Sequence, residues 1–182
     1  MRVRSKWNKK DKTHTIEEVG GALSYIAWQI AQNALLNMEN HQFQADTVKQ
    51  RIDIMAEFLC FTTHIIDRMT IDRFDADERT RFMSELALKT AKRIKDNRRE
   101  LFGDGNYEQE FIDLLNSRMA EYSEFAYDDE DGPSFPMKRY FGDYVTQQFG
   151  EKFQKWVTDQ IIDIEVPGLM KTLRQSVKNL FM

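Results

Sequence analysis

The chain has 182 residues, 41% of them hydrophobic and 31% charged, a composition that excludes a largely disordered protein. It contains only 8 glycines and 3 prolines, which argues against a β-sandwich or barrel because those folds turn every few residues. The net charge of −4 argues against a basic nucleic-acid-binding body, and the single cysteine excludes an intramolecular disulfide. A lone cysteine suits a reducing compartment, so we expect a cytoplasmic protein.

The charge is unevenly distributed, because residues 1–12 carry six basic residues and one acidic residue. We predict that residues 1–14 form a flexible basic arm and that residues 15–182 form a single all-α domain. The domain itself is net acidic, so we expect no binding of nucleic acid except weakly through residues 1–12.

The first helix is predicted to begin at Thr15, because Thr15 and Glu18 have the spacing of a capping box. Residues 19–38 contain no charged residue, and amides such as Gln29 and Asn33 interrupt their apolar content. Amides are costly in hydrocarbon, so we expect no transmembrane span. Small residues recur along the helix at Gly20, Ser24, Ala27, Ala31 and Ala34. They let other helices approach closely, and we expect this helix to be buried within the fold or across a subunit interface.

The second helix is predicted over residues 45–69, where apolar residues form two neighbouring seams along its length. A helix with two seams contacts several other helices, so we expect it to be the central element. A capping box at Asp75 and Glu78 predicts a third helix that ends near Leu101, and a fourth follows over residues 107–125.

A loop with no strand is predicted over residues 127–136, where an acidic run is followed by glycine and two prolines. Helices are expected over residues 137–149 and 151–165, and Pro167 is expected to break the pattern before a terminal helix that ends near Leu180. The sequence therefore predicts an all-α, single-domain bundle of six or seven helices with a central second helix.

Cys60, His64 and Asp67 lie on the predicted second helix at spacings of four and three residues, which place them on one face. Thiolate, imidazole and carboxylate groups all bind divalent transition metals, so this trio is a candidate metal site. Glu57 lies on the same side about two turns from His64, and both are candidate ligand-binding residues. An alternative role for His64 is that of a general base oriented by Asp67. The structural alternative is a polar strip that packs against neighbouring helices.

Lys138, Arg139 and Tyr140 form a second candidate ligand-binding group, a basic and aromatic patch just after the predicted loop. Such a patch fits a phosphate or an acidic segment of a partner molecule. The acidic run of residues 128–131 lies close by in the sequence, so we expect the patch to pair with that run within the chain.

None of these patterns is a diagnostic catalytic motif. We therefore predict a non-enzymatic protein that acts by protein–protein association, as a homodimer formed through residues 19–38 or the C-terminal helices. The alternative is a small-molecule-binding or metal-binding helical protein, including an enzyme, centred on Cys60, His64 and Asp67, with a divalent transition metal as the cofactor.

Overall fold

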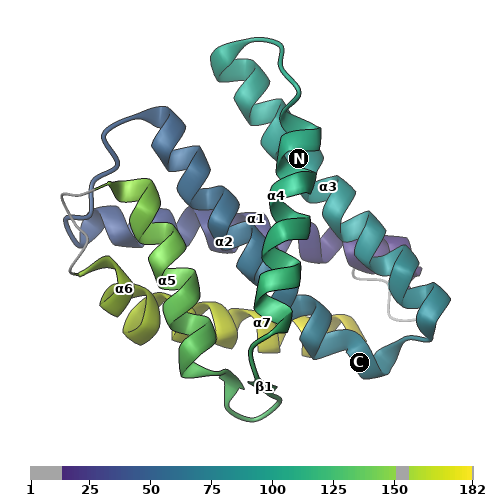
Figure 1. Cartoon of the computed structure of the whole chain (residues 1–182). Coiled ribbons are helices and arrows are strands. Elements are labelled where there is room, and N and C mark those ends of the chain that lie inside the picture. Colours follow the sequence, from purple (N-terminus) through teal and green to yellow (C-terminus); the bar gives the residue numbers. More distant parts are fainter. Residues whose placement is uncertain (1–13, 151–155, 182) are drawn as a thin grey trace, which may run out of the picture.

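The helix α2 (Val48–Thr70) is the element around which the others are arranged in the computed structural model, which describes residues 14–150 and 156–181 (Figure 1). Every residue of α2 from Ile54 to Asp67 is buried. The helices that pack on it are α1 (Ile16–Asn40), α3 (Ala76–Phe102), α4 (Tyr107–Ser123), α5 (Phe135–Phe149) and α7 (Val166–Phe181). The prediction of an all-α bundle with a central second helix is confirmed.

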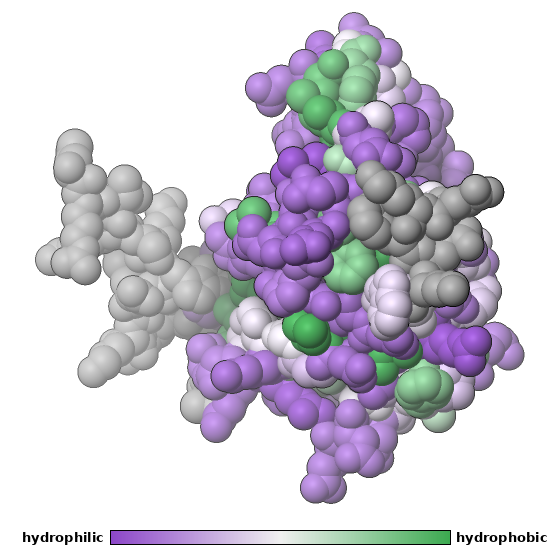
Figure 2. Space-filling view, turned by 90° about the vertical axis from the view of Figure 1, so that its left-hand side faces the viewer, coloured by the Kyte–Doolittle hydropathy of each residue, from purple (hydrophilic) through white to green (hydrophobic). Residues whose placement is uncertain are grey.

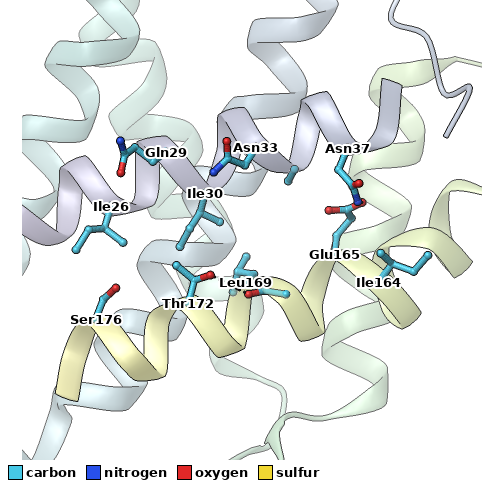
Figure 3. Close-up of a pocket in the computed structure, with 12 residues that line it drawn as sticks. Ile26, Gln29, Ile30, Asn33, Asn37, Ile164, Glu165, Leu169, Thr172 and Ser176 are labelled. Atoms are coloured by element: carbon cyan, nitrogen blue, oxygen red, sulfur yellow. Dashed lines mark hydrogen bonds between the residues drawn. The ribbon is translucent and has the colours of Figure 1, made fainter. Parts of the chain in front are cut away.

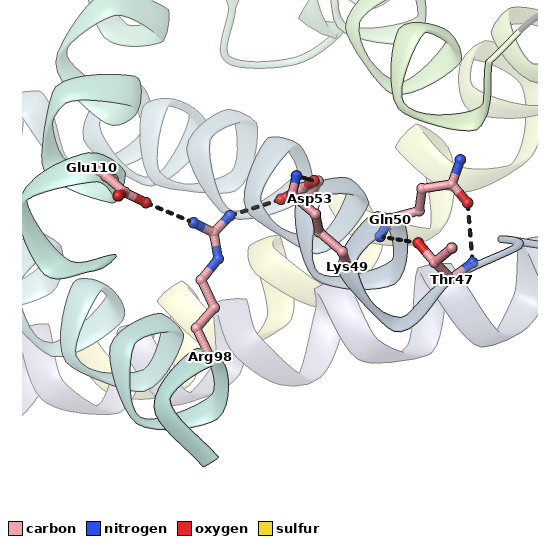
Figure 4. A network of polar contacts seen from close by, with 6 residues as sticks. All are labelled: Thr47, Lys49, Gln50, Asp53, Arg98 and Glu110. Carbon is pink, nitrogen blue, oxygen red and sulfur yellow. Dashed lines mark hydrogen bonds and ion pairs between the residues drawn. The ribbon is translucent and has the colours of Figure 1, made fainter. Parts of the chain in front are cut away.

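Side-chain caps determine where the long helices begin. The capping boxes predicted at Thr15 and at Asp75 are both present, and each fixes the first residue of its helix. A third capping box, formed by Thr47 and Gln50, begins α2 and was missed by the sequence analysis (Figure 4). This is why α2 begins at Val48 rather than at residue 45.

Helices α3 and α4 form a pair that is held to the central helix by charge. The guanidinium of Arg98, on α3, donates to a carboxylate oxygen of Asp53 on α2 at 2.7 Å and to Glu110 on α4 at 3.1 Å (Figure 4). Arg98 is mostly buried, with 17% of its side chain exposed, so this bridge is partly shielded from solvent. One side chain therefore connects three helices.

The close contact between α1 and α3 depends on a glycine, Gly20, which has no side chain. A Cβ atom at Gly20 would lie 3.2 Å from the carbonyl oxygen of Phe82 and 3.3 Å from the Cβ of Glu85. The other small residues predicted to let helices approach are buried, and they are Ser24, Ala27, Ala31 and Ala34. Helix α1 packs against α2, α3 and α7, as expected for a helix with more than one contact surface.

The C-terminal helix is continuous, so the predicted break at Pro167 was wrong. Helix α6 (Val157–Gln160) passes through a π-helical segment (Ile161–Glu165) directly into α7. In an α-helix, proline lacks the N–H group and its ring clashes with the carbonyl four residues earlier. The residue just before the proline is Val166, and its N–H group bonds to the carbonyl of Ile161, which lies five residues earlier rather than four. This wider turn accommodates the proline. Of the helix predicted over residues 151–165, residues 151–155 lie outside the described residues.

The acidic loop contains a short hairpin, so the expectation of no strand was wrong there. Strands β1 (Tyr127–Asp128) and β2 (Gly132–Pro133) pair antiparallel. Gly132 has a φ of 82°, which favours glycine, and a Cβ at this position would lie 2.9 Å from the Cε of Met170. The hairpin therefore packs closely against α7. Elsewhere in the fold, a short 3₁₀ turn (Ile71–Arg73) follows the end of α2.

The surface seen in Figure 2 is mostly hydrophilic, with apolar residues in small separate patches. Within residues 14–150 and 156–181, no helix is both long enough and apolar enough to cross a bilayer. The arm predicted over residues 1–14 lies outside the described part of the chain, apart from its last residue.

We predict that Gly20→Leu lowers the free energy of unfolding by about 2 kcal/mol, because a side chain at this position forces α1 away from α3. Gly21→Leu is the matched control, since no atom lies within 4 Å of a Cβ at Gly21. The control is expected to leave stability unchanged or slightly raised, because leucine favours helix more than glycine does. Urea denaturation of both variants measures the difference, and equal effects of the two substitutions would contradict the packing described.

Candidate functional site

The four candidate residues on the central helix are all buried. The exposed fractions are 2% for Glu57, 0% for Cys60, 2% for His64 and 6% for Asp67. A buried charge is stable only when it is paired and hydrogen-bonded, so the partners of these residues decide what they can do.

Each of the two carboxylates is held by an arginine from another helix. Asp67 accepts two hydrogen bonds from Arg79 on α3, at 2.8 and 2.7 Å. Glu57 accepts two from Arg118 on α4, at 2.8 and 2.9 Å. Both oxygens of each carboxylate are engaged in these bidentate pairs, so the charge of each carboxylate is balanced by an arginine within the fold.

His64 is held as a neutral ring. Burial, followed by the nearby charge of Arg68, lowers the pKa of His64 to about 4. Neither ring nitrogen has a hydrogen-bond partner among the described residues, and the ring packs on Tyr122 with 5.6 Å between centroids. Because the Asp67 carboxylate is bonded to Arg79, it does not orient His64 as a general base.

The predicted metal trio is not brought together as a metal site. Burial raises the pKa of Cys60, which favours the thiol over the thiolate that metals bind. Among the described residues, no three histidine, cysteine, aspartate or glutamate side chains are grouped so that they would hold a metal ion. The surface hollow beside Asp67 is lined by Arg79, Met83 and Met119 among others, and neither Cys60 nor His64 reaches it. These contacts give the polar strip of α2 a structural role.

The partners of this strip lie on α4 and α5, and their pairing with it was not predicted from the sequence. Arg118 lies over the ring of Tyr144, with its Cζ 3.3 Å from the ring centroid. The Tyr144 hydroxyl donates to Glu121 at 2.9 Å and lies 3.1 Å from the Tyr140 hydroxyl. Arg118 and Glu57 are 61 residues apart, so no local spacing signals their pairing.

Lys138, Arg139 and Tyr140 do not form a single patch. Tyr140 packs inward against Phe125, with 5.1 Å between ring centroids, while Arg139 is exposed. Lys138 lines a different hollow, next to α7. The expected pairing with the acidic run was wrong, since within the described residues neither cation forms an ion pair with residues 128–131.

A groove of about 450 Å³ runs between α1 and α7, which lie antiparallel (Figure 3). Ile26 and Ile30 point toward it from α1, and Thr172 and Ser176 point toward it from α7 (Figure 3). Among the described residues that line the groove, the one with a charged side chain is Glu165, which is buried at the end of the groove. The carboxylate of Glu165 accepts hydrogen bonds from the amides of Asn37 at 2.7 Å and Gln160 at 2.9 Å. Burial raises the pKa of Glu165 despite these bonds.

The outer face of α1 beside this groove is exposed and uncharged. Its exposed residues are Tyr25, Gln29, Gln32, Asn33 and Leu36, and the exposed fractions of Tyr25 and Leu36 are 48% and 55%. The amides of Gln29, Gln32 and Asn33 are therefore not buried within the fold, whereas Asn37 is half-buried and bonds to Glu165. For the three exposed amides this removes one of the two arrangements expected from the sequence. The other arrangement, burial against a second subunit, needs a surface of this kind.

No known protein family, curated protein or solved structure matches the chain. A function is therefore inferred from the chemistry of the surfaces described above. Of these, the uncharged face of α1 and the groove beside it are accessible, whereas the polar strip of α2 is enclosed.

We predict that Arg118→Met lowers the free energy of unfolding by about 3–5 kcal/mol, because it leaves the buried Glu57 carboxylate without a cation. The double variant Glu57→Leu/Arg118→Met is expected to recover most of that loss. Lys49→Met is the control, since Lys49 is 73% exposed and its ion pair with Asp53 contributes less than about 1 kcal/mol. Urea denaturation measures all three, and a double variant no more stable than Arg118→Met would contradict this pairing.

We predict that His64 makes the protein less stable in mild acid. The unfolded chain binds a proton at His64 below about pH 6.5, whereas the folded protein does not until about pH 4, so stability falls as the pH drops through this window. Between pH 7 and pH 5 the wild type is expected to lose about 2 kcal/mol more than His64→Leu. His41→Leu, which removes a histidine at an exposed position, is the matched control. Identical pH profiles for wild type and His64→Leu would overturn this assignment.

Proposed function

We propose that the protein acts by self-association, as a homodimer in which the exposed face of α1 packs against the same face of a second copy. The observation that supports this most is the absence of charge over residues 19–38 on a helix whose amide side chains are exposed. A solvated helix face ordinarily carries lysine and glutamate, as the exposed side of α3 does.

The chemistry of this face suits a second copy more than an unrelated partner. A two-fold axis brings each residue opposite itself or a close neighbour, so a charged face would repel its own copy. Amides both donate and accept hydrogen bonds, so Gln29, Gln32 and Asn33 can pair with the same residues of another chain. The face is therefore complementary to itself.

The groove and its rim add apolar area to this contact. Leu36 and Ile164 are exposed, at 55% and 43%. Each lies next in sequence to a residue at the end of the groove, Leu36 before Asn37 and Ile164 before Glu165, and those two residues are hydrogen-bonded to each other. Gly168, Thr172 and Ser176 recur at four-residue spacing along the α7 side, where they leave room for side chains of the second copy. Covering these residues removes exposed apolar surface from water, which favours association.

The alternative centred on Cys60, His64 and Asp67 has less support, because all three residues are buried and, of the three, Asp67 alone lines a surface hollow, where it is paired with Arg79. We place the homodimer in the cytoplasm, since its lone cysteine is buried and needs no oxidising compartment.

We expect opposite charges on this face to test the symmetry of the dimer. Gln29→Glu/Gln32→Glu and Gln29→Lys/Gln32→Lys are each expected to be monomeric, because each brings like charges together across the two-fold axis. An equimolar mixture of the two variants is expected to form a heterodimer. Size-exclusion chromatography with light scattering measures the mass of each sample.

The control variants are Asn116→Glu and Asn116→Lys, on the exposed side of α4, and they are expected to keep the wild-type mass. A mixture that stays monomeric, or charged variants that remain dimeric alone, would show that the face of α1 does not meet itself.

A further inference from the structure

A second surface, outside the proposed dimer contact, carries a concentration of positive charge, although two of its cations, Arg68 and Arg73, also lie over the rings of Tyr127 and Phe181. Two adjoining hollows, of about 590 and 370 Å³, lie along α7 and share Arg174 and Lys178. The cations that line them are Lys138, Lys171, Arg174, Lys178, Arg68 and Arg73. They come from four elements, so the fold gathers them onto one surface of a protein whose net charge is −4.

These cations have no carboxylate partners. None of the six forms an ion pair with another described residue, although Asp72, Asp129 and Asp131 also line the hollows. By contrast, each lysine of α2 and α3 is paired with an acidic residue. The six cations therefore outnumber the three aspartates that line the same hollows, and none of the six is held in an ion pair among the described residues.

The acidic loop borders this surface, but none of its carboxylates forms an ion pair with the six cations among the described residues. The Asp128 carboxylate accepts hydrogen bonds at 2.8 Å from the backbone N–H groups of Glu130 and Asp131, so it is directed into its own turn. Arg174 donates one nitrogen to the backbone carbonyls of Asp129 and Glu130 rather than to a carboxylate. Among the described residues, its other guanidinium nitrogens have no hydrogen-bond partner.

The spacing of the charges indicates what they would bind. Lys171, Arg174 and Lys178 follow one another at intervals of three and four residues, which forms a row about 10 Å long on one side of the helix. A single phosphate contacts only part of such a row, whereas two or three linked or neighbouring phosphates extend along it. The larger hollow also has an apolar wall formed by Pro133, Val166, Pro167 and Met170.

We propose that this surface binds a polyphosphorylated organic group, with its phosphates along the α7 row and its organic part against the apolar wall. Lysine and arginine bind phosphate oxygens through charge-assisted hydrogen bonds, and the guanidinium of Arg174 has a fork of donors available for them. Lys138, on α5, lines the same hollow. The group has two possible sources, a soluble polyphosphate ester or the headgroup of a polyphosphorylated lipid.

Calorimetric titration of the full chain with adenosine triphosphate and with inorganic tripolyphosphate tests the soluble source. Sedimentation with phosphatidylcholine vesicles, with and without phosphatidylinositol bisphosphate, tests the lipid source. Saturable binding in either arm supports the proposal and identifies the source, and adenosine triphosphate is expected to bind more tightly than tripolyphosphate because it also contacts the apolar wall. Binding is expected to weaken as salt is raised.

The variant Lys171→Gln/Lys178→Gln is expected to weaken binding about tenfold or more. The matched control is Lys89→Gln/Lys92→Gln, which changes the net charge equally at two exposed lysines of α3 and is expected to bind as the wild type does. The proposal is overturned if no probe binds saturably, if the α7 variant binds as tightly as the wild type, or if a polyglutamate peptide competes as well as adenosine triphosphate does. Neither variant changes a residue on the exposed face of α1, so both are expected to keep the mass of the wild type. A failure of phosphate binding can therefore be distinguished from a failure of dimerisation.

Discussion

The fold depends on the need to neutralise two carboxylates on a helix that is buried on every side. Glu57 and Asp67 lie on α2 among apolar residues, and each would be strongly destabilising there without a cation. Arg118 satisfies one from α4, and Arg79 satisfies the other from α3. These pairs fix the positions of α3 and α4 relative to α2. The same contacts occupy the polar strip that the sequence suggested as a metal or catalytic site.

Because the polar strip is enclosed, the accessible chemistry of the molecule lies on its outer helices. Helix α1 packs on α2 and α3 through its small and apolar residues and leaves its amides exposed beside α7. Helix α7 borders that uncharged groove and also carries a row of unpaired cations. One helix therefore contributes to two surfaces of different chemistry, an uncharged one that suits self-association and a cationic one that suits phosphate.

Local signals predicted the fold well, because they act within a few residues. The boxes at Thr15 and Asp75 fixed helix starts, and the two apolar seams identified α2 as central. Contacts between distant segments were not predictable in this way, and Glu57 with Arg118 is the main example. The local rule for Pro167 failed because a π-helical turn precedes it. Lys138, Arg139 and Tyr140 were grouped by adjacency, although successive residues on a helix point about 100° apart.

Sedimentation equilibrium of the wild-type chain tests most directly whether the uncharged face of α1 joins two copies. Self-association predicts a mass twice that of the 21.6 kDa chain at micromolar concentrations, falling toward the monomer mass on dilution. A mass of 21.6 kDa that does not change with concentration throughout the micromolar range would contradict it.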